Sequence, residues 1–195
     1  MLALTFVVLL FFFIVGMGIV LYNSLVRKRN IYKNAFAQID VQLQRRLDLV
    51  PNIVESVRAY MKHESETLQN VIAARNGAQS ALQDAKRAPE SPQALKQLSQ
   101  SNQHLNSALR QLAVMVENYP DLKANQNMLH LQEELVSTEN KVAFSRQSYN
   151  DAVMEYNTSL ERFPQNLLVG VFGFQPAVLF QAETSPIKDA VRIQF

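Results

Sequence analysis

The sequence predicts an all-α protein in which one N-terminal transmembrane helix continues into an elongated antiparallel bundle of three to four long helices. Residues 2–22 form an apolar run without a charge. Between residues 23 and 163 the only glycine is Gly77, and apolar residues recur there at steps of three and four, as they do on one face of a helix. We therefore expect an anchor over 1–22, a bundle over 23–163, and a short irregular tail over 164–195.

The anchor prediction rests on length. At about 1.5 Å per residue, the helix from Leu2 to Tyr22 spans roughly 30 Å, the thickness of one hydrocarbon core. The alternative is a cleaved secretory signal, which has a basic start, a shorter apolar stretch and a small-residue cleavage site. The one small-residue pattern, Gly16-Met17-Gly18, lies inside the run. The sequence favours an uncleaved anchor.

Basic residues follow the anchor directly: Arg27, Lys28, Arg29 and Lys33. Lys and Arg beside a span are retained in the cytoplasm, so this basic collar predicts an outer N-terminus and a cytoplasmic body. Such a collar also attracts anionic lipid head groups. We expect the lipid bilayer as a partner and no nucleic acid, because no aromatic-interleaved basic stripe is present.

The first helical stripe, a row of apolar residues on one face of a helix, continues from the anchor. Pro51 cannot donate to the carbonyl of Leu47, yet the stripe keeps its phase, which predicts a kink with continued packing. On this basis the helix and its continuation should reach about Ala85. The members of the stripe are Tyr32, Phe36, Ile39, Leu43, Leu47, Val50, Val54, Val57 and Met61.

Two more stripes follow a connection at 88–92, which contains two prolines. The second runs from Leu95 to Tyr119 with the narrow seam of a bundle or coiled coil. The third runs from Met128 to Phe163 and would form a helix of roughly 60 Å, a length that suits an elongated bundle. Phe163-Pro164 should end it.

The tail contains a short helix and then irregular chain, and its aromatic residues Phe172, Phe174 and Phe180 require burial. They could cap one end of the bundle. Alternatively, they could form an interface with a partner or with lipid head groups.

A second candidate interaction surface is polar. It contains Gln38, Asp40, Gln42, Arg45, Arg46 and Asp48. These side chains could pair with one another on a solvated helix face, or they could recognise another subunit, since Arg binds carboxylates in a bidentate manner.

Two Tyr-Asn dipeptides lie one heptad apart on the third stripe, Tyr149-Asn150 and Tyr156-Asn157. A tyrosine in a helical seam buries its ring while its hydroxyl needs a partner. We expect these residues to fix the register between helices.

Catalytic and metal-binding patterns are weak. His63-Glu64-Ser65-Glu66 lacks the second histidine four residues later that a zincin needs. His130 with Glu133 and Glu134 has ligand spacing that is common by chance. The sequence contains no cysteine. No cofactor, metal site or catalytic residue is predicted, and enzymatic function is not supported.

Several segments resemble the LemA family of bacterial membrane proteins. They are YNSLVRKRN at 22–30, AFAQIDVQLQRRLDLVPNIVESVRAY at 35–60, YPDLKANQNMLHLQEEL at 119–135, TENKVAFSRQSYNDAVMEYN at 138–157 and FPQNLLVGVFGF at 163–174. Phe36 stands where the family often has tryptophan. The resemblance implies an N-terminally anchored helical bundle in the bacterial inner membrane and supplies no catalytic residues.

The resemblance also links relatives to the formation of internal membrane organelles, and family genes to membrane metalloproteases. The leading hypothesis is therefore a non-enzymatic scaffold or adaptor that self-associates or recruits membrane partners, in one version a membrane-remodelling protein. The alternative is a regulatory or sensor subunit of a membrane metalloprotease. A remote alternative is a metal-dependent enzyme at His130 and Glu134.

Overall fold

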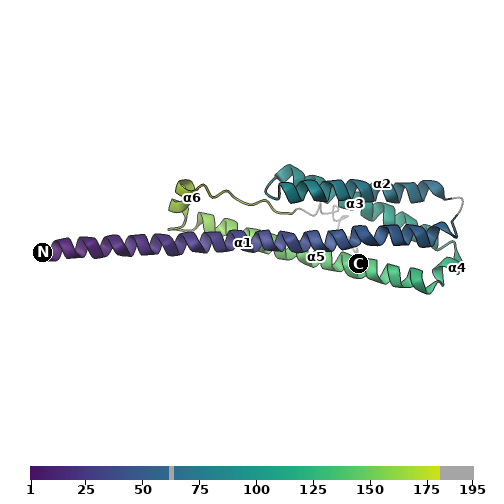
Figure 1. Cartoon of the computed structure of the whole chain (residues 1–195), viewed down its shortest axis with the longest axis horizontal. Coiled ribbons are helices and arrows are strands. Elements are labelled where there is room, and N and C mark those ends of the chain that lie inside the picture. The colour runs from purple at the N-terminus through teal and green to yellow at the C-terminus, as the bar shows by residue number, and fades with distance from the viewer. Residues whose placement is uncertain (62–63, 181–195) are drawn as a thin grey trace, which may run out of the picture.

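The computed structural model describes residues 1–61 and 64–180, and within these ranges the regular structure is entirely helical. The long helices are α1 (Leu2–Arg58), α2 (Ser65–Arg87), α3 (Pro92–Val116) and α5 (Gln126–Glu161). Two short ones are α4 (Pro120–Lys123) and α6 (Asn166–Phe172). Figure 1 shows an elongated bundle from which the N-terminal part of α1 projects alone. The predicted all-α fold is confirmed.

The four long helices form two pairs. α1 packs along α5, α2 packs along α3, and α1 also contacts α2. In Figure 1 the α2/α3 pair runs along the part of the α1/α5 pair that is farther from the N-terminus. Because α1 is one continuous helix, no loop separates its projecting N-terminal part from its part within the bundle.

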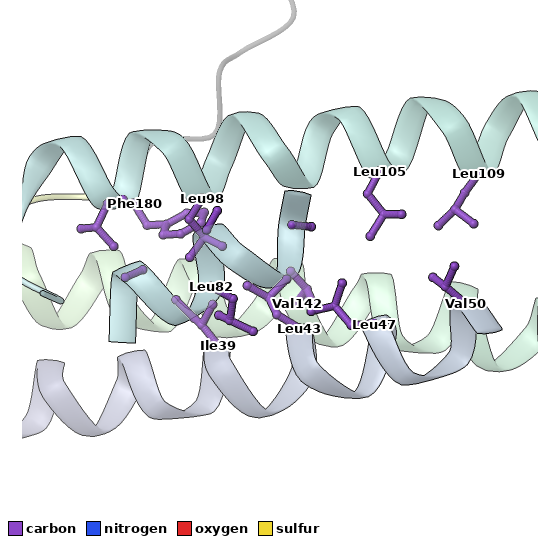
Figure 2. Packing of buried hydrophobic residues seen from close by; sticks show 14 of the residues in the cluster. Ile39, Leu43, Leu47, Val50, Leu82, Leu98, Leu105, Leu109, Val142 and Phe180 are labelled. Atoms are coloured by element: carbon purple, nitrogen blue, oxygen red, sulfur yellow. The ribbon is translucent and has the colours of Figure 1, made fainter. Parts of the chain in front are cut away.

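The core lies between the two pairs and is built largely from the predicted stripes. Phe163, the last residue of the third stripe, is an exception, because it lies beyond the end of α5 and is 79% exposed. Ile39, Leu43 and Val50 of α1 are each at most 2% exposed. Figure 2 shows these residues on the side of α1 that faces Leu98 and Leu105 of α3, which are fully buried. Because the apolar residues recur at steps of three and four, each helix places them all on one side.

Only α1, among the described residues, is long and apolar enough to cross a membrane. Its most apolar 18-residue window contains no buried residue. Leu4, Phe6 and Phe13 are each at least 67% exposed. This part of α1 therefore presents apolar side chains outward on every side.

Two helix starts follow from local side-chain chemistry. Ser91 caps α3 by accepting a hydrogen bond from the Ala94 N–H, and Pro92 occupies the first helical position, where no N–H is needed. Asn125 caps α5 through hydrogen bonds from the N–H groups of Asn127 and Met128. These caps explain why the chain begins new helices at these positions.

The prediction that the first helix and its continuation would reach about Ala85 is wrong. α1 ends at Arg58, and the chain reverses before α2 begins at Ser65. Met61 and Leu68 are both buried, seven residues apart on the sequence stripe. The apolar period thus continues across the reversal, and no glycine or proline marks it, so periodicity alone could not detect this turn.

Pro51 does not end α1, which continues through it to Arg58. Because proline has no N–H, the Leu47 carbonyl has no donor four residues later. The structure supplies one from another helix: Arg75 Nε of α2 donates to the Leu47 carbonyl at 3.2 Å. The proline therefore creates a point of attachment between α1 and α2.

Candidate interaction surfaces and the tail clamp

An aromatic seam joins α1 to α5. The ring of Tyr32 lies 5.1 Å from that of Tyr156 and 6.4 Å from that of Tyr149, measured between centroids. Phe36 lies 5.9 Å from Tyr149. Offset and edge-to-face arrangements at these distances are favourable. Tyr149 and Tyr156 are each 1% exposed, so their rings belong to the core.

The hydroxyls of these tyrosines need partners because the rings are buried. Tyr32 donates to Glu90 Oε1 at 3.2 Å, which connects α1 to the α2–α3 connection. Burial raises the pKa of Tyr149 to about 12. Burial is also the main cause of a raised pKa at Tyr32, and the charge of Glu90 adds to it.

The C-terminal tail runs back along α5 as an extended segment, and Tyr156 and Asn157 hold its first part. Tyr156 donates to the Gln175 carbonyl at 3.1 Å. Asn157 Nδ2 donates to the Ala177 carbonyl at 2.8 Å, and the Ala177 N–H donates to Asn157 Oδ1 at 2.9 Å. One asparagine therefore satisfies both backbone groups of one tail residue.

The same pattern repeats one heptad earlier on the helix. Tyr149 donates to the Val178 carbonyl at 2.8 Å. Asn150 Nδ2 donates to the Phe180 carbonyl at 3.1 Å, and the Phe180 N–H donates to Asn150 Oδ1 at 2.8 Å. We call these four side chains and their six hydrogen bonds the tail clamp.

The repeat has a geometric basis. Seven residues of α-helix advance about 10.5 Å, and three residues of extended chain advance about 10 Å. A heptad step from Tyr156 to Tyr149 thus matches a three-residue step from Gln175 to Val178. Two identical dipeptides one heptad apart can therefore bind an extended segment in a regular register.

The sequence predicted that Tyr149, Asn150, Tyr156 and Asn157 would set the register between helices. The rings of Tyr149 and Tyr156 lie in the α1–α5 seam. The tyrosine hydroxyls and the two asparagine amides bind the backbone of the tail. The signal for the second role is the amide beside each tyrosine, because an amide pairs with both the N–H and the C=O of one residue.

The aromatic tail residues differ in exposure. Phe174 and Phe180 are 4% and 2% exposed and belong to the core cluster. Phe172 is 53% exposed. Residues 174–180 thus pack on the side of the bundle, whereas α6 does not contribute a buried residue. The remainder of the predicted tail, 181–195, lies outside the described residues.

Three of the four collar residues contact the bundle. Lys28 donates to Ser159 Oγ at 2.7 Å and lies 3.1 Å from Glu155 Oε1. The Arg29 guanidinium lies over the Phe174 ring, 5.4 Å from its centroid.

Lys33, the third of them, pairs with Glu90 at 2.9 Å, and this hydrogen bond is the main reason that the pKa of Glu90 is lowered. Arg27 is exposed. The collar therefore fastens the end of the bundle to α1 as well as carrying charge.

The polar surface on α1 divides between contacts and solvent. Asp40 pairs with Lys86 of α2 at 2.9 Å, and Arg45 pairs with Glu134 of α5. Asp48 accepts from Gln44 at 2.9 Å. Gln38 is exposed and Gln42 is half-buried. A hollow of about 440 Å³ is lined in part by Asp40, Arg45 and Asp48.

Arg46 belongs to the interior. It is 2% exposed, and its Nη2 lies 3.4 Å from Glu139 Oε1 of α5. Burial lowers its pKa, and Glu139 opposes that effect. Its Nε has no hydrogen-bond partner. The Arg46 guanidinium is therefore a buried charge between α1 and α5, inaccessible to a partner subunit.

The histidine positions do not assemble a metal centre in the part of the chain that the structure describes. No group of three or more His, Asp or Glu side chains there could hold an ion. His130 is exposed, and the neighbouring Glu134 pairs with Arg45. His63 lies outside the described residues.

Comparison with known proteins identifies relatives. Over 175 residues the chain is 26% identical to Magnetosome protein MamQ 1 of Paramagnetospirillum magneticum. The aligned residues cover 82% of this chain and 64% of that protein. This chain is 25% identical over 177 residues to Magnetosome protein MamQ of Magnetospirillum gryphiswaldense, with the same coverage. It is 27% identical over 177 residues to Protein LemA of Metamycoplasma hominis, covering 88% of this chain and 76% of that protein.

The chain thus spans less than two thirds of the length of the MamQ proteins. A family-level comparison matches the LemA family over residues 35–195, which includes most of the bundle and the tail and excludes the apolar run and the basic collar. The match covers the tail clamp, the polar surface and the aromatic seam except Tyr32. On this evidence, the chain belongs to the LemA family.

Proposed function

We propose that this protein is a membrane-anchored scaffold that acts by self-association and by contact with other membrane proteins. The observation that carries the proposal is the continuity of α1, a helix of 57 residues that extends about 85 Å. Its first part is apolar on every side, and its second part forms one wall of the bundle core. One rigid element would thus hold the bundle at a bilayer surface.

We place the bundle on the cytoplasmic side of a bacterial inner membrane. The support is the collar, because Lys and Arg beside a span are retained in the cytoplasm. Arg27 remains exposed, and Arg29 lies near the exit from the apolar run. The names of the relatives, magnetosome proteins and a LemA protein, state no reaction.

The surface that we propose for self-association is the solvent-facing side of α1. Gln38, Val41, Arg45 and Asp48 follow one another at steps of three and four, so they share one face. All four are exposed, and Val41 is 56% exposed. Two copies anchored in one bilayer stand parallel, so the same face of each copy can contact the other. In such a contact, Arg45 of one copy lies within one helical turn of Asp48 of the other.

The test is the mass of the full-length protein in a mild detergent. We expect a multiple of 22.1 kDa for the wild type and a shift toward the monomer for Val41→Asp. The matched control is Val114→Asp on α3, because Val114 is also exposed, at 69%. A wild type that is monomeric and co-purifies with no membrane protein overturns the proposal.

The two alternatives have less support. A regulatory subunit of a membrane metalloprotease rests on the family resemblance alone. A metal-dependent enzyme at His130 and Glu134 has to compete with the ion pair that Glu134 already forms with Arg45. Elemental analysis of the purified protein tests the second of these directly.

A further inference from the structure

The chain has a second apolar element besides the anchor, and it comprises Phe163 and α6. The sequence from Phe163 to Phe174 contains no charged residue. Phe163, Leu167 and Val171 are 79%, 63% and 76% exposed. Leu167 and Val171 are four residues apart, so they share one face of α6. Single exposed apolar residues are ordinary on a protein surface, but this is a cluster within a few residues.

The position of this cluster is fixed by Tyr22, the last residue of the apolar run. The Phe172 ring lies 4.8 Å from the Tyr22 ring, and the Phe174 ring lies 5.7 Å from it. Figure 1 shows α6 beside α1 at the end of the bundle from which the apolar part of α1 projects. The exposed face of α6 therefore lies level with the point where α1 would leave the bilayer.

Positive charge lies on the body side of the cluster. Arg29 is seven residues, about 10 Å, beyond Tyr22 along α1, and its guanidinium lies over Phe174. Apolar side chains toward the membrane and cations a short distance away match the two layers of a bilayer surface, acyl chains and anionic head groups.

We propose that α6 and Phe163 insert into the lipid surface beside the anchor and form a second membrane contact. This inference rests on the proposed anchoring by Leu2–Tyr22. A lipid surface fits the cluster better than a second copy does, because an uncharged apolar face at this level would meet lipid in every copy of the protein.

The second contact has a mechanical consequence. A single transmembrane helix leaves the bundle free to rotate about the axis of α1. A second insertion point to one side of that axis fixes both the rotation and the tilt. It would thereby determine which face of the bundle is turned toward neighbouring molecules and which is turned toward the bilayer.

The chain contains no tryptophan, so single tryptophans report their own surroundings. We would place Leu167→Trp and Val171→Trp in α6 and Phe11→Trp in the anchor, each in the full-length protein. The matched controls are Phe144→Trp and Val114→Trp, because Phe144 and Val114 are 70% and 69% exposed on the bundle, away from the apolar run. Each protein is reconstituted in phosphatidylcholine and phosphatidylglycerol vesicles with or without brominated acyl chains.

We expect brominated lipid to quench the α6 variants and the anchor variant and to leave both control variants unchanged. The α6 variants should also emit at shorter wavelengths than the controls. If brominated lipid quenches Phe11→Trp but neither α6 variant, the inference is wrong and the anchor stands. If it does not quench Phe11→Trp, the anchor itself is wrong.

The remaining outcome distinguishes lipid from protein. Emission of Leu167→Trp at a short wavelength without quenching by brominated lipid would mean that protein, such as a second copy, covers α6. That result would also overturn the inference, because the proposal assigns lipid as the occupant.

Discussion

The side-chain amide of Asn157 both donates a hydrogen bond to the Ala177 carbonyl and accepts one from the Ala177 N–H. It thus takes the place of a neighbouring β-strand for the backbone of Ala177. Asn150 and Phe180 repeat this arrangement. In this way a protein whose described regular structure is all helical holds an extended segment along its side, without a second strand.

Asn157→Ala should release Ala177 from α5. Both backbone groups of Ala177 lose their partner, and a lost buried hydrogen bond costs about 1–3 kcal/mol. Urea unfolding should show a decrease in the free energy of unfolding of that order, and hydrogen exchange at the Ala177 amide should become faster. Asn140→Ala, at an exposed position of the same helix, should change stability by less than about 0.5 kcal/mol. Equal effects of the two substitutions would contradict the role of the clamp.

Pro51 and Arg75 should be energetically coupled. Arg75→Met removes the donor to the Leu47 carbonyl, which has no other helical donor while Pro51 is present. In a Pro51→Ala background the Ala N–H can satisfy that carbonyl, so the same Arg75 substitution should cost less. A double-mutant cycle measured by urea unfolding should give a coupling of about 1 kcal/mol. Additive costs would show that the Arg75 contact does not compensate for the proline.

Arg46 should contribute less to stability than its burial suggests. Replacing a buried ionic group by an apolar side chain of similar volume is often neutral or stabilising, because the cost of desolvation disappears. Arg46→Met should therefore leave the midpoint of thermal unfolding unchanged or raise it. Glu139→Gln removes the partner of the buried cation and should destabilise by about 1–2 kcal/mol, since Glu139 is partly exposed.

The control for Arg46 is Arg45→Met, because Arg45 forms an ion pair at the surface. Exposed pairs contribute about 0–1 kcal/mol. A large loss of stability in Arg46→Met, with a small one in Glu139→Gln, would mean that the guanidinium has partners that outweigh its desolvation.

The aromatic seam should make the fold sensitive to alkaline pH. Burial raises the pKa of Tyr149 to about 12, and the pKa of Tyr156 is also raised, mainly by burial. A raised pKa in the folded state means that the neutral form stabilises the fold below the unfolded pKa of about 10. This stabilisation should be lost as the pH rises from about 10 to about 12.

Tyrosinate absorbance and helical circular dichroism, measured together, test this prediction, and the absence of tryptophan keeps the absorbance signal simple. Part of the tyrosinate signal should appear only as helix is lost. The Tyr149→Phe variant should show one such delayed ionisation fewer. Titration of all tyrosines near pH 10 in a fully helical protein would be the opposite result.

Much of the fold was predictable from the sequence because helix formation is periodic and local. The stripe from Tyr32 to Met61 is buried along its whole length, and Ser91-Pro92 and Asn125 begin helices where the turn chemistry indicates. The reversal after Arg58 was not predictable, because Met61 and Leu68 keep the period of one face across it. The spacing of apolar residues indicates which side of a helix is buried, but it does not indicate the direction in which the next helix runs.

The candidate surfaces were predictable only as sets of residues. Arg45 and Arg46 are adjacent in the sequence and both basic, yet one is exposed and the other is 2% exposed. Adjacent helix positions point about 100° apart, and the neighbouring helices decide which of them is covered.

From the sequence alone it follows that the chain is helical, that residues 2–22 are apolar enough to span a membrane, and which face of α1 and of α3 is buried. The packing of the helices sets three further features: the tail returns along α5, Arg75 donates to the Leu47 carbonyl, and α6 lies beside Tyr22. These three features differ from the first set because the contacting residues are far apart in the sequence. Periodicity and capping act within a few residues, whereas these contacts join groups far apart along the chain, which meet only after the helices have packed.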